Sequence, residues 1–136
     1  MSSIPESYHE LFEKETYAHF ATLTPEGFPH VTPVWIDYDP GADRVLVNTA
    51  RGRRKERNVR ADPRVGVSMV DPDDAYRYCS VVGEVSALTD EGAEDHIDGL
   101  AARYLGTETY PGYENDPGPR MIVEIRPDEV FTADVS

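Results

Sequence analysis

The chain has 136 residues, of which 26 are Asp or Glu and 13 are Lys or Arg, so its formal net charge at pH 7 is −13. This length predicts a single domain, residues 1–136, with a core of its own. Its apolar runs fall far short of the roughly 20 residues that span a bilayer, and its acidic surface is repelled by anionic lipid and nucleic acid. We therefore expect neither a membrane nor a nucleic acid as a partner.

Cysteine and lysine usage indicate the setting in which the protein works. A single cysteine, Cys79, excludes an internal disulfide, and the first residues lack the basic and apolar pattern of a signal peptide, so we expect a cytoplasmic protein. Two lysines stand against eleven arginines, and the acids are dispersed, a pattern typical of proteins that stay soluble in very high salt. We interpret the chain as halophilic, and an acidic protein of ordinary origin is the alternative.

The first residues predict a short amphipathic helix. Ser3 is a residue type that caps helices, and Pro5 suits a first helical turn. The apolar side chains that follow share one helical face: Tyr8, Leu11 and Phe12.

Strand signals come next. Residues 17–24 and 28–39 are rich in strand-forming side chains, and Pro25 and Gly27 between them supply the turn chemistry of a β-hairpin. A second turn then leads into a strand at 44–49.

The middle of the chain predicts a helix and two strands. A short helix over 53–62 is ended by Pro63. Strands follow at 64–71 and 76–89, and Gly83 inside the second strand indicates a bulge or a close approach of another backbone.

Residues 90–106 predict a longer helix, with Asp90 as its cap and Gly106 as its end. Its apolar face consists of Ile97, Leu100, Ala101, Tyr104 and Leu105.

A loop over 107–120, rich in Gly, Pro, Tyr and acids, precedes two closing strands at 120–127 and 129–134. Six or seven strands in mostly hairpin order, with two or three short helices, do not alternate as in a parallel sheet. We therefore predict a mainly β fold that closes as a small antiparallel barrel, because closure removes exposed strand edges.

Basic residues are concentrated in one window. Seven of the thirteen Lys and Arg residues fall within 51–64, where Glu56 and Asp62 are the anions, so the window carries +5 and the rest of the chain −18. This concentration indicates that something anionic is held there.

The order of residues in this window favours a phosphate. A strand that ends in Asn48 and Thr49 runs through a small-residue turn into Arg53, Arg54 and Lys55 at the start of a helical turn. A hydroxyl, backbone N–H groups, a helix N-terminus and fixed cations then meet at one place. The alternative is that the arginines cover an acidic surface through exposed ion pairs, each contributing about 0 to 1 kcal/mol.

The usual catalytic patterns are missing from the sequence, which has no GxSxG, HExxH, CxxC, Walker loop or GxGxxG. The histidines are too scattered to predict a metal site: His9, His19, His30 and His96. Cys79 lies in an alternating strand and is interpreted as a core residue rather than a nucleophile. The acidic run at 71–76 is interpreted as a solvated turn rather than a divalent-ion site.

The chain resembles the pyridoxamine 5′-phosphate oxidase-like FMN-binding split-barrel family in four stretches that occur in this order: FPHVTPVWIDYD, VLVNTARGRRKERNVRADPRVGV, YRYCSVVGEVSALTDEG and RMIVEIRPDEVF. More narrowly, it resembles the branch of probable deazaflavin (coenzyme F-420) dependent enzymes. The resemblance covers about residues 5 to 133, and its most specific part is the PVW…T.RGRRKERN…DPR series.

The resemblance implies a six-stranded split barrel that works as a homodimer, with two cofactors in grooves between the protomers. Arg54 and Lys55 match the pair that holds the cofactor phosphate, and Asn48 with Thr49 matches the strand end beside it. Arg53 and Arg57 add positive charge beyond what one phosphate requires. They either face the tail of the deazaflavin or are solvated at the surface.

Other positions match the family's contacts with the isoalloxazine ring. Thr32, Pro33 and Val34 match the strand whose backbone lines that ring, and Tyr78 matches a polar residue donated by the neighbouring protomer. Trp35 either reaches the groove or fills the core.

The sequence also departs from the family pattern. The ending EVFTADVS lacks the arginine-rich segment with which true pyridoxamine phosphate oxidases hold their substrate, so we do not expect that specific activity. We expect an oxidoreductase that uses FMN or coenzyme F-420 for hydride transfer with a small-molecule substrate, and we assign no catalytic side chain.

Three alternatives remain from the sequence. One is a flavin-storage or sensing protein that binds the cofactor without turnover. A haem-binding member of the wider split-barrel group would require His30 or His19 in the groove. A nucleic-acid binder is disfavoured by the −18 that surrounds the basic window.

Overall fold

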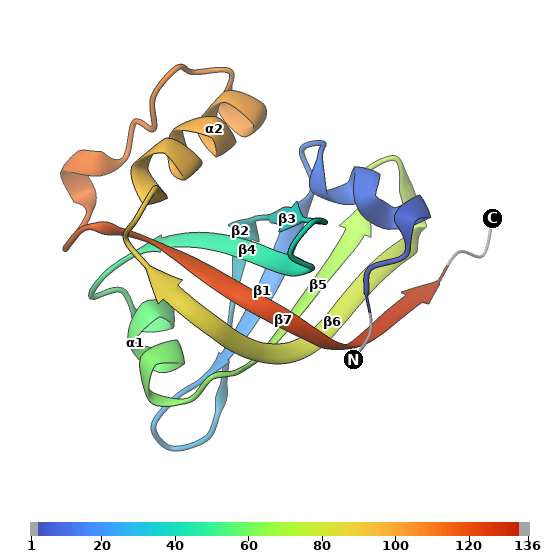
Figure 1. Ribbon diagram of the computed structural model, residues 1–136, viewed down its shortest axis with the longest axis horizontal. Helices are drawn as coiled ribbons and strands as arrows, with labels where there is room; N and C mark the ends of the chain where they lie inside the picture. The colour runs from blue at the N-terminus through green and yellow to red at the C-terminus, as the bar shows by residue number, and fades with distance from the viewer. Residues whose placement is uncertain (1–2, 134–136) are drawn as a thin grey trace.

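The computed structural model describes residues 3–133, whose strands form one antiparallel sheet in the order β2-β1-β5-β6-β7-β4-β3 (Figure 1). The strands are β1 Tyr17–Leu23, β2 Pro29–Trp35, β3 Asp37–Asp39, β4 Arg44–Ala50, β5 Arg64–Asp71, β6 Asp74–Thr89 and β7 Arg120–Ala133. The helices are the 3₁₀ helices η1 Glu6–Phe12 and η2 Tyr113–Asn115 and the α-helices α1 Arg54–Ala61 and α2 Ala93–Leu105. The sheet curls into a half-barrel, which confirms the mainly β split-barrel class.

The two edge strands of this sheet are consecutive in the sequence. β2 ends at Trp35 and β3 begins at Asp37, so Ile36 carries the chain from one edge of the sheet to the other. Side chains of α2 bond the backbone at this seam. The Ile36 N–H donates to Tyr104 Oη at 3.2 Å, and Arg103 Nη1 donates to the Ile36 carbonyl at 3.0 Å.

The long strands β6 and β7 curve across the molecule side by side (Figure 1). Their register shifts between Val82 and Gly83 and again between Val85 and Ala87. A Cβ on Gly83 would lie 2.0 Å from the carbonyl oxygen of Arg126, so a side chain has no room there. The bulge and close backbone approach predicted at Gly83 are both confirmed.

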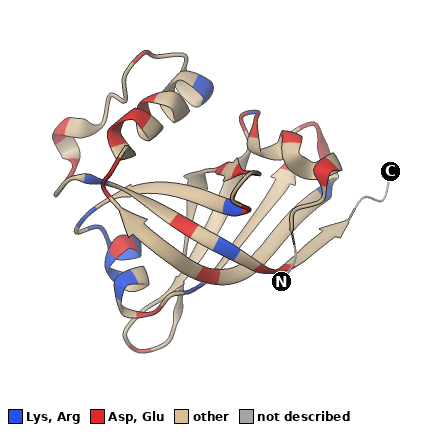
Figure 2. Cartoon of the chain, in the orientation of Figure 1, with Lys and Arg blue, Asp and Glu red and all other residues tan. Residues whose placement is uncertain are grey.

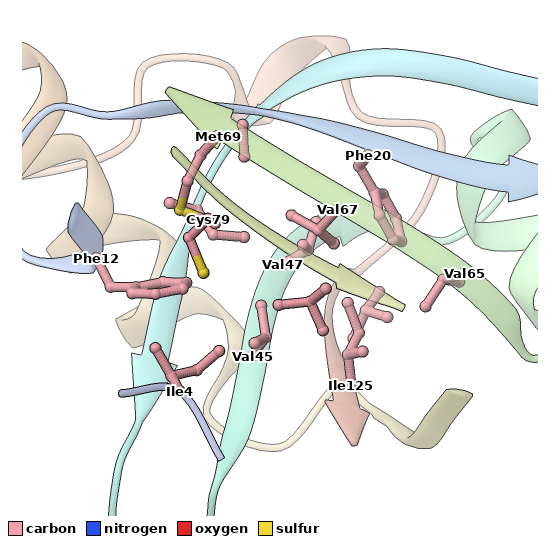
Figure 3. Close-up of a cluster of buried hydrophobic side chains, with 14 of the residues drawn as sticks. Ile4, Phe12, Phe20, Val45, Val47, Val65, Val67, Met69, Cys79 and Ile125 are labelled. Atoms are coloured by element: carbon pink, nitrogen blue, oxygen red, sulfur yellow. The ribbon is translucent and has the colours of Figure 1, made fainter. Parts of the chain in front are cut away.

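The core lies inside the curl of the sheet, where alternate strand residues point inward (Figure 3). Its members include Phe20, Val45, Val47, Val67, Met69, Val81, Val123 and Ile125. Cys79 is fully buried among them, and this burial raises the pKa of its thiol to about 11. The interpretation of Cys79 as a core residue is therefore confirmed.

The helices pack against the sheet in different places, and η1 and α1 contribute Leu11, Phe12 and Val59 to the core. α1 contacts β1 and β4, and α2 contacts β7 and β4. In the part of the chain that the structure describes, no helix is long and apolar enough to cross a membrane.

Several predicted elements differ from the structure. The predicted strand over 28–39 divides at Ile36, and the last two predicted strands form one strand, β7. These two differences cancel in the count, and the described sheet has seven strands where the family resemblance implied six. The sequence hides both differences. The strand-like alternation of apolar and polar side chains continues through Ile36, where the chain passes from one edge of the sheet to the other, and the strand continues through Pro127. Asp134, the last residue of the predicted closing strand, lies outside the described residues.

Two helix predictions also need correction. The N-terminal helix is 3₁₀ in geometry, and Ser3 donates to Asp43 instead of capping it. α2 begins after Gly92, whose φ of +75° sets the turn, so the Asp90 cap was wrong. Leu105, expected on the buried face, is half exposed.

The prediction of a solvated acidic turn at 71–76 was wrong for Asp71, which is buried. Its carboxylate accepts hydrogen bonds from Lys14 Nζ and from Arg77 Nη1, each at 2.8 Å. Arg77 also donates to Glu10 of η1 at 2.9 Å, so this ionic cluster fastens η1 to the β5–β6 hairpin. Among residues 3–133, no group of His, Cys, Asp and Glu is arranged to hold a metal ion.

Candidate functional site

A cleft of about 430 Å³ lies between β2, β4, the start of α1 and helix α2. The strands β1, β2 and β4 line it with Tyr17, Pro33, Val34, Trp35, Asn48 and Thr49. The helices, the loop after α2 and the start of β7 add Arg53, Lys55, Ile97, Leu100, Tyr110 and Arg120. The cleft therefore has an apolar, largely aromatic part and a cationic part.

Buried polar side chains fix the position of α1, which brings Lys55 to the cleft. Glu56 Oε1 accepts from the Gly52 N–H at 2.7 Å, and Gly52 has a φ of +99° that favours glycine. Glu56 is fully buried and pairs with Arg60. Asn58 Nδ2 donates to Thr22 Oγ1 at 2.9 Å, which ties the helix to β1. The turn and the first helical residues are thus held rigidly.

Three cations meet at one end of the cleft. Arg53 and Arg120 share one carboxylate, that of Asp116, at 3.2 and 3.0 Å. No carboxylate within residues 3–133 pairs with Lys55. The three cations and one anion leave a net charge of +2 here, in a chain whose other acids are spread over the remaining elements (Figure 2).

The surroundings of Lys55 suit an anion. Its pKa lies below the ordinary value of 10.5 because burial removes water from the ammonium group and because Arg53 and Arg120 repel it. Nearby, Thr49 is 2% exposed, and its Oγ1 lacks a hydrogen-bond partner among the described residues. An anion placed between them would accept from the hydroxyl and offset the repulsion between the cations.

Aromatic rings form the other part of the cleft. Trp35 stacks on Tyr104 with 5.1 Å between ring centroids and 9° between planes. Tyr17 meets Tyr104 edge-on, and Tyr110 meets Trp35 edge-on. The Arg120 guanidinium lies 4.8 Å from the centre of the Tyr110 ring, which joins the aromatic part to the cationic part.

The model of one protein family, described as pyridoxamine 5′-phosphate oxidase, matches residues 4–134. The chain belongs to this family. Among solved structures, an F420 reductase is 34% identical with a TM-score of 0.80, and the match covers 94% of this chain and 98% of that one.

More distant structures support the fold of this pyridoxamine 5′-phosphate oxidase family member. A conserved hypothetical protein from Mycobacterium tuberculosis is 22% identical, with a TM-score of 0.73, over 96% of this chain and 85% of the other. General Stress Protein 26 from Bacillus anthracis is 18% identical, with a TM-score of 0.69, over 95% of this chain and 92% of the other.

Seven of the ten site residues predicted from the sequence line the cleft: Pro33, Val34, Trp35, Asn48, Thr49, Arg53 and Lys55. Trp35 thus reaches the cleft while stacking on Tyr104. Three others lie elsewhere in this family member. Thr32 keeps a buried hydroxyl without a partner within residues 3–133, Arg54 is exposed on the first turn of α1, and Tyr78 is 39% exposed on β6.

Sequence reasoning missed Tyr17, Ile97, Leu100, Tyr110 and Arg120, all of which line the cleft. Arg120 opened one of the four stretches that resemble the family, but no role was assigned to it, and Tyr110 stood in a segment interpreted as a loop. A usable signal was the pair of tyrosines in that loop, Tyr110 and Tyr113, because large aromatic side chains usually pack against other groups. His19 and His30, which a haem site would require, are not among the residues that line the cleft of this family member.

Proposed function

We propose that this chain binds a flavin or deazaflavin cofactor in the cleft and acts as an oxidoreductase, transferring hydride between the cofactor and a small-molecule substrate. One observation carries the proposal. Lys55, a partly buried cation without a carboxylate partner in the described chain, lies in the same cleft as Thr49, whose buried hydroxyl has no hydrogen-bond partner among the described residues. Family membership and the likeness to an F420 reductase support it.

The residues of the cleft fit such a cofactor in both of its parts. A phosphate requires cations and hydrogen-bond donors, which Lys55, Arg53 and Thr49 provide. A flat ring system requires an apolar slot, which Pro33 and Trp35 of β2 border, together with Ile97 and Leu100 of α2.

When bound, the cofactor supplies the hydride chemistry. The chain's own residues bind and orient it: the cations hold the phosphate end, and β2 with α2 bounds the ring end and keeps water away. We assign no side chain as general acid or base, so the proton would come from solvent or from the substrate. The +2 charge of the cationic end suits an FMN phosphate and a deazaflavin phosphodiester alike, and the likeness to an F420 reductase favours the deazaflavin.

We further propose that the protein is a homodimer whose partner covers the outer face of the sheet. Pro33, His19, Ser68, Ser80 and Phe131 are paired in succession across five strands, so their side chains share this face. Large apolar residues are exposed on it: Val31, Val70, Tyr76, Tyr78, Val82 and Phe131.

The cleft opens at the margin of this outer face, because Tyr17, Pro33 and Trp35 alternate onto the same side. A second copy seated there would wall the cleft and bring its own Tyr78 toward the cofactor. Obligate interfaces often bury more than about 2,000 Å². Light scattering that gives the monomer mass of 15.2 kDa would contradict the dimer.

An absorbance spectrum of the purified protein tests cofactor binding, and stopped-flow oxidation of the reduced cofactor by candidate acceptors tests turnover. We expect FMN or coenzyme F-420 to bind and the reduced form to be oxidised faster in the complex than in free solution. Binding without any acceleration would favour the alternative of a storage or sensing protein. A Soret band with no flavin binding would overturn the proposal.

A further inference from the structure

Asn48, which lines the cleft, has three hydrogen-bond partners. Its Nδ2 donates to the Ala93 carbonyl at 2.9 Å, and its Oδ1 accepts from Arg120 Nε at 2.9 Å. The same Nδ2 lies 3.0 Å from Nδ1 of His96, and His96 Nε2 lies 3.0 Å from Asp37 Oδ2. These contacts form a relay that runs from Arg120 in the cleft to a carboxylate on β3.

The chemistry of the partners determines which atoms carry protons. A guanidinium has donors alone, and a carbonyl oxygen is an acceptor alone, so the Asn48 amide must turn its oxygen to Arg120 and its NH₂ to Ala93. The remaining N–H of that NH₂ points at His96 Nδ1, which therefore presents a lone pair. The ring proton of His96 is then on Nε2, where it donates to Asp37.

Asp37 is suited to accept a hydrogen bond from the Nε2–H group of His96. Burial acts to raise its pKa, but hydrogen bonds from His96 and from the backbone at Tyr38, together with the charge of Arg103, hold the pKa below its ordinary value of 3.8. Arg103 Nη2 donates to its other oxygen at 3.2 Å. The carboxylate is thus ionised and fixed, and it fixes the imidazole.

We propose that His96 is a positioning residue: as the neutral Nε2–H tautomer, it holds the Asn48 amide in the orientation that directs Arg120 into the cleft. Without an acceptor at the place of Nδ1, one Asn48 N–H loses its partner. If the amide then rotates, its NH₂ meets Arg120 Nε, donor against donor, and the guanidinium shifts. The inference rests on the proposed anion site and adds a residue that does not itself line the cleft.

Two nearly isosteric variants separate the two ring nitrogens. In His96→Asn the side-chain oxygen can replace the Nδ1 acceptor, whereas in His96→Gln the side-chain NH₂ can replace the Nε2 donor and the acceptor is lost. Titration calorimetry with inorganic phosphate and with FMN should show binding weakened about two- to tenfold in His96→Gln, the range of one neutral hydrogen bond, and nearly unchanged in His96→Asn. A merely structural role would lower the thermal stability of both variants and leave phosphate affinity equal in the two.

The tautomer is measured on the wild-type protein by ¹⁵N-detected NMR of the imidazole, so this test survives if a variant does not fold. A proton found on Nδ1 would overturn the proposal, as would wild-type phosphate affinity in a folded His96→Gln. Lys55→Ala separates a failure of the His96 inference from a failure of the proposed anion site. If it weakens phosphate binding while both His96 variants bind normally, this inference fails and the anion site stands; if Lys55→Ala also binds normally, the anion site itself fails.

Discussion

Arg53 and Arg120 donate to the same oxygen atom, Oδ1 of Asp116, at 3.2 and 3.0 Å. One guanidinium stands at the start of α1 and the other at the start of β7, so the carboxylate between them joins two distant parts of the chain. Its side chain is 5% exposed. Asp116 therefore lies where it orients both guanidinium groups and also competes with any external anion for them.

Replacing this carboxylate should strengthen anion binding. In Asp116→Asn the charge of the cationic end rises from +2 to +3, and we expect inorganic phosphate to bind about fivefold more tightly at low salt, a difference of about 1 kcal/mol. The gain should shrink in molar salt because screening weakens the added attraction. Calorimetric titration measures both, with Asp62→Asn as a control outside the cleft. Weaker binding in Asp116→Asn would mean that orienting the guanidinium groups matters more than competition.

Lys55→Ala should weaken binding of FMN or coenzyme F-420 by about ten- to a hundredfold, because a charge-assisted hydrogen bond contributes about 1.5 to 3 kcal/mol. Arg64→Ala is the matched control, since Arg64 is 69% exposed and pairs with Asp62 away from the cleft. The family resemblance predicts a loss for Arg54→Ala as well, and the exposed position of Arg54 favours a smaller one. Equal affinities in all of these proteins would show that the site is misplaced.

As the pH is raised, phosphate affinity should begin to fall at a lower pH than it would with a lysine of ordinary pKa. The pKa of Lys55 in the free protein is below 10.5, so its charge is complete below that lowered pKa and is lost as the pH rises through it. Affinity measured from pH 8 upward should therefore be flat and then decline before pH 10.5 is reached. Lys55→Arg keeps its charge over this range and should remove the decline. A decline of the same size in Lys55→Arg would assign it to another group.

Acid should weaken the attachment of η1 through Asp71. Burial acts to raise the pKa of Asp71, but hydrogen bonds from Lys14, the Asp73 N–H and Arg77 lower it to about 2. The stabilisation is thus present above the ordinary value of 3.8 and is lost as the pH falls toward 2. Asp71→Asn should lower the free energy of unfolding by about 1.5 to 3 kcal/mol at pH 6.

Urea unfolding of wild type and Asp71→Asn between pH 2 and pH 6 measures this difference. The gap between them should close toward the acid end of that range. Asp73→Asn, at a residue whose side chain is 78% exposed, serves as the control and should change little. A gap that stays constant across this pH range would show that the carboxylate acts through packing and not through its charge.

The acidic surface predicts a protein that needs salt. Twenty-six acids against thirteen bases repel one another over a Debye length of about 10 Å at 0.1 M salt, which falls to about 3 Å at 1 M. The melting temperature should therefore rise between 0.1 M and 1 M potassium chloride. An unchanged melting temperature would remove the halophilic interpretation.

Local chemistry made parts of this molecule predictable. Pro63 ends α1 because proline cannot continue the helix, and Gly106 ends α2 with a φ of +71°. Thr49, Arg53 and Lys55 were predicted together because they are neighbours in the sequence, and the structure keeps them in one cleft.

The residues that were missed reach the cleft through contacts between distant segments. Asp116 draws Arg53 to a loop that follows α2, and no periodicity connects those two segments. Tyr17 looked like an ordinary strand residue, since its role depends on which face of the sheet borders the cleft. Similarly, Ile36 continues a strand pattern while the chain leaves one edge of the sheet for the other.

The seam at Ile36 makes the cleft and the barrel one cooperative unit. If α2 detached, the Ile36 N–H and carbonyl would lose Tyr104 and Arg103, and each backbone group left unbonded inside the protein costs about 1 to 3 kcal/mol. The same helix provides Ile97 and Leu100 to the cleft. Local opening of the cleft is therefore coupled to opening of the barrel, and a ligand held there raises the resistance of the whole domain to unfolding, in proportion to the logarithm of its concentration over its dissociation constant.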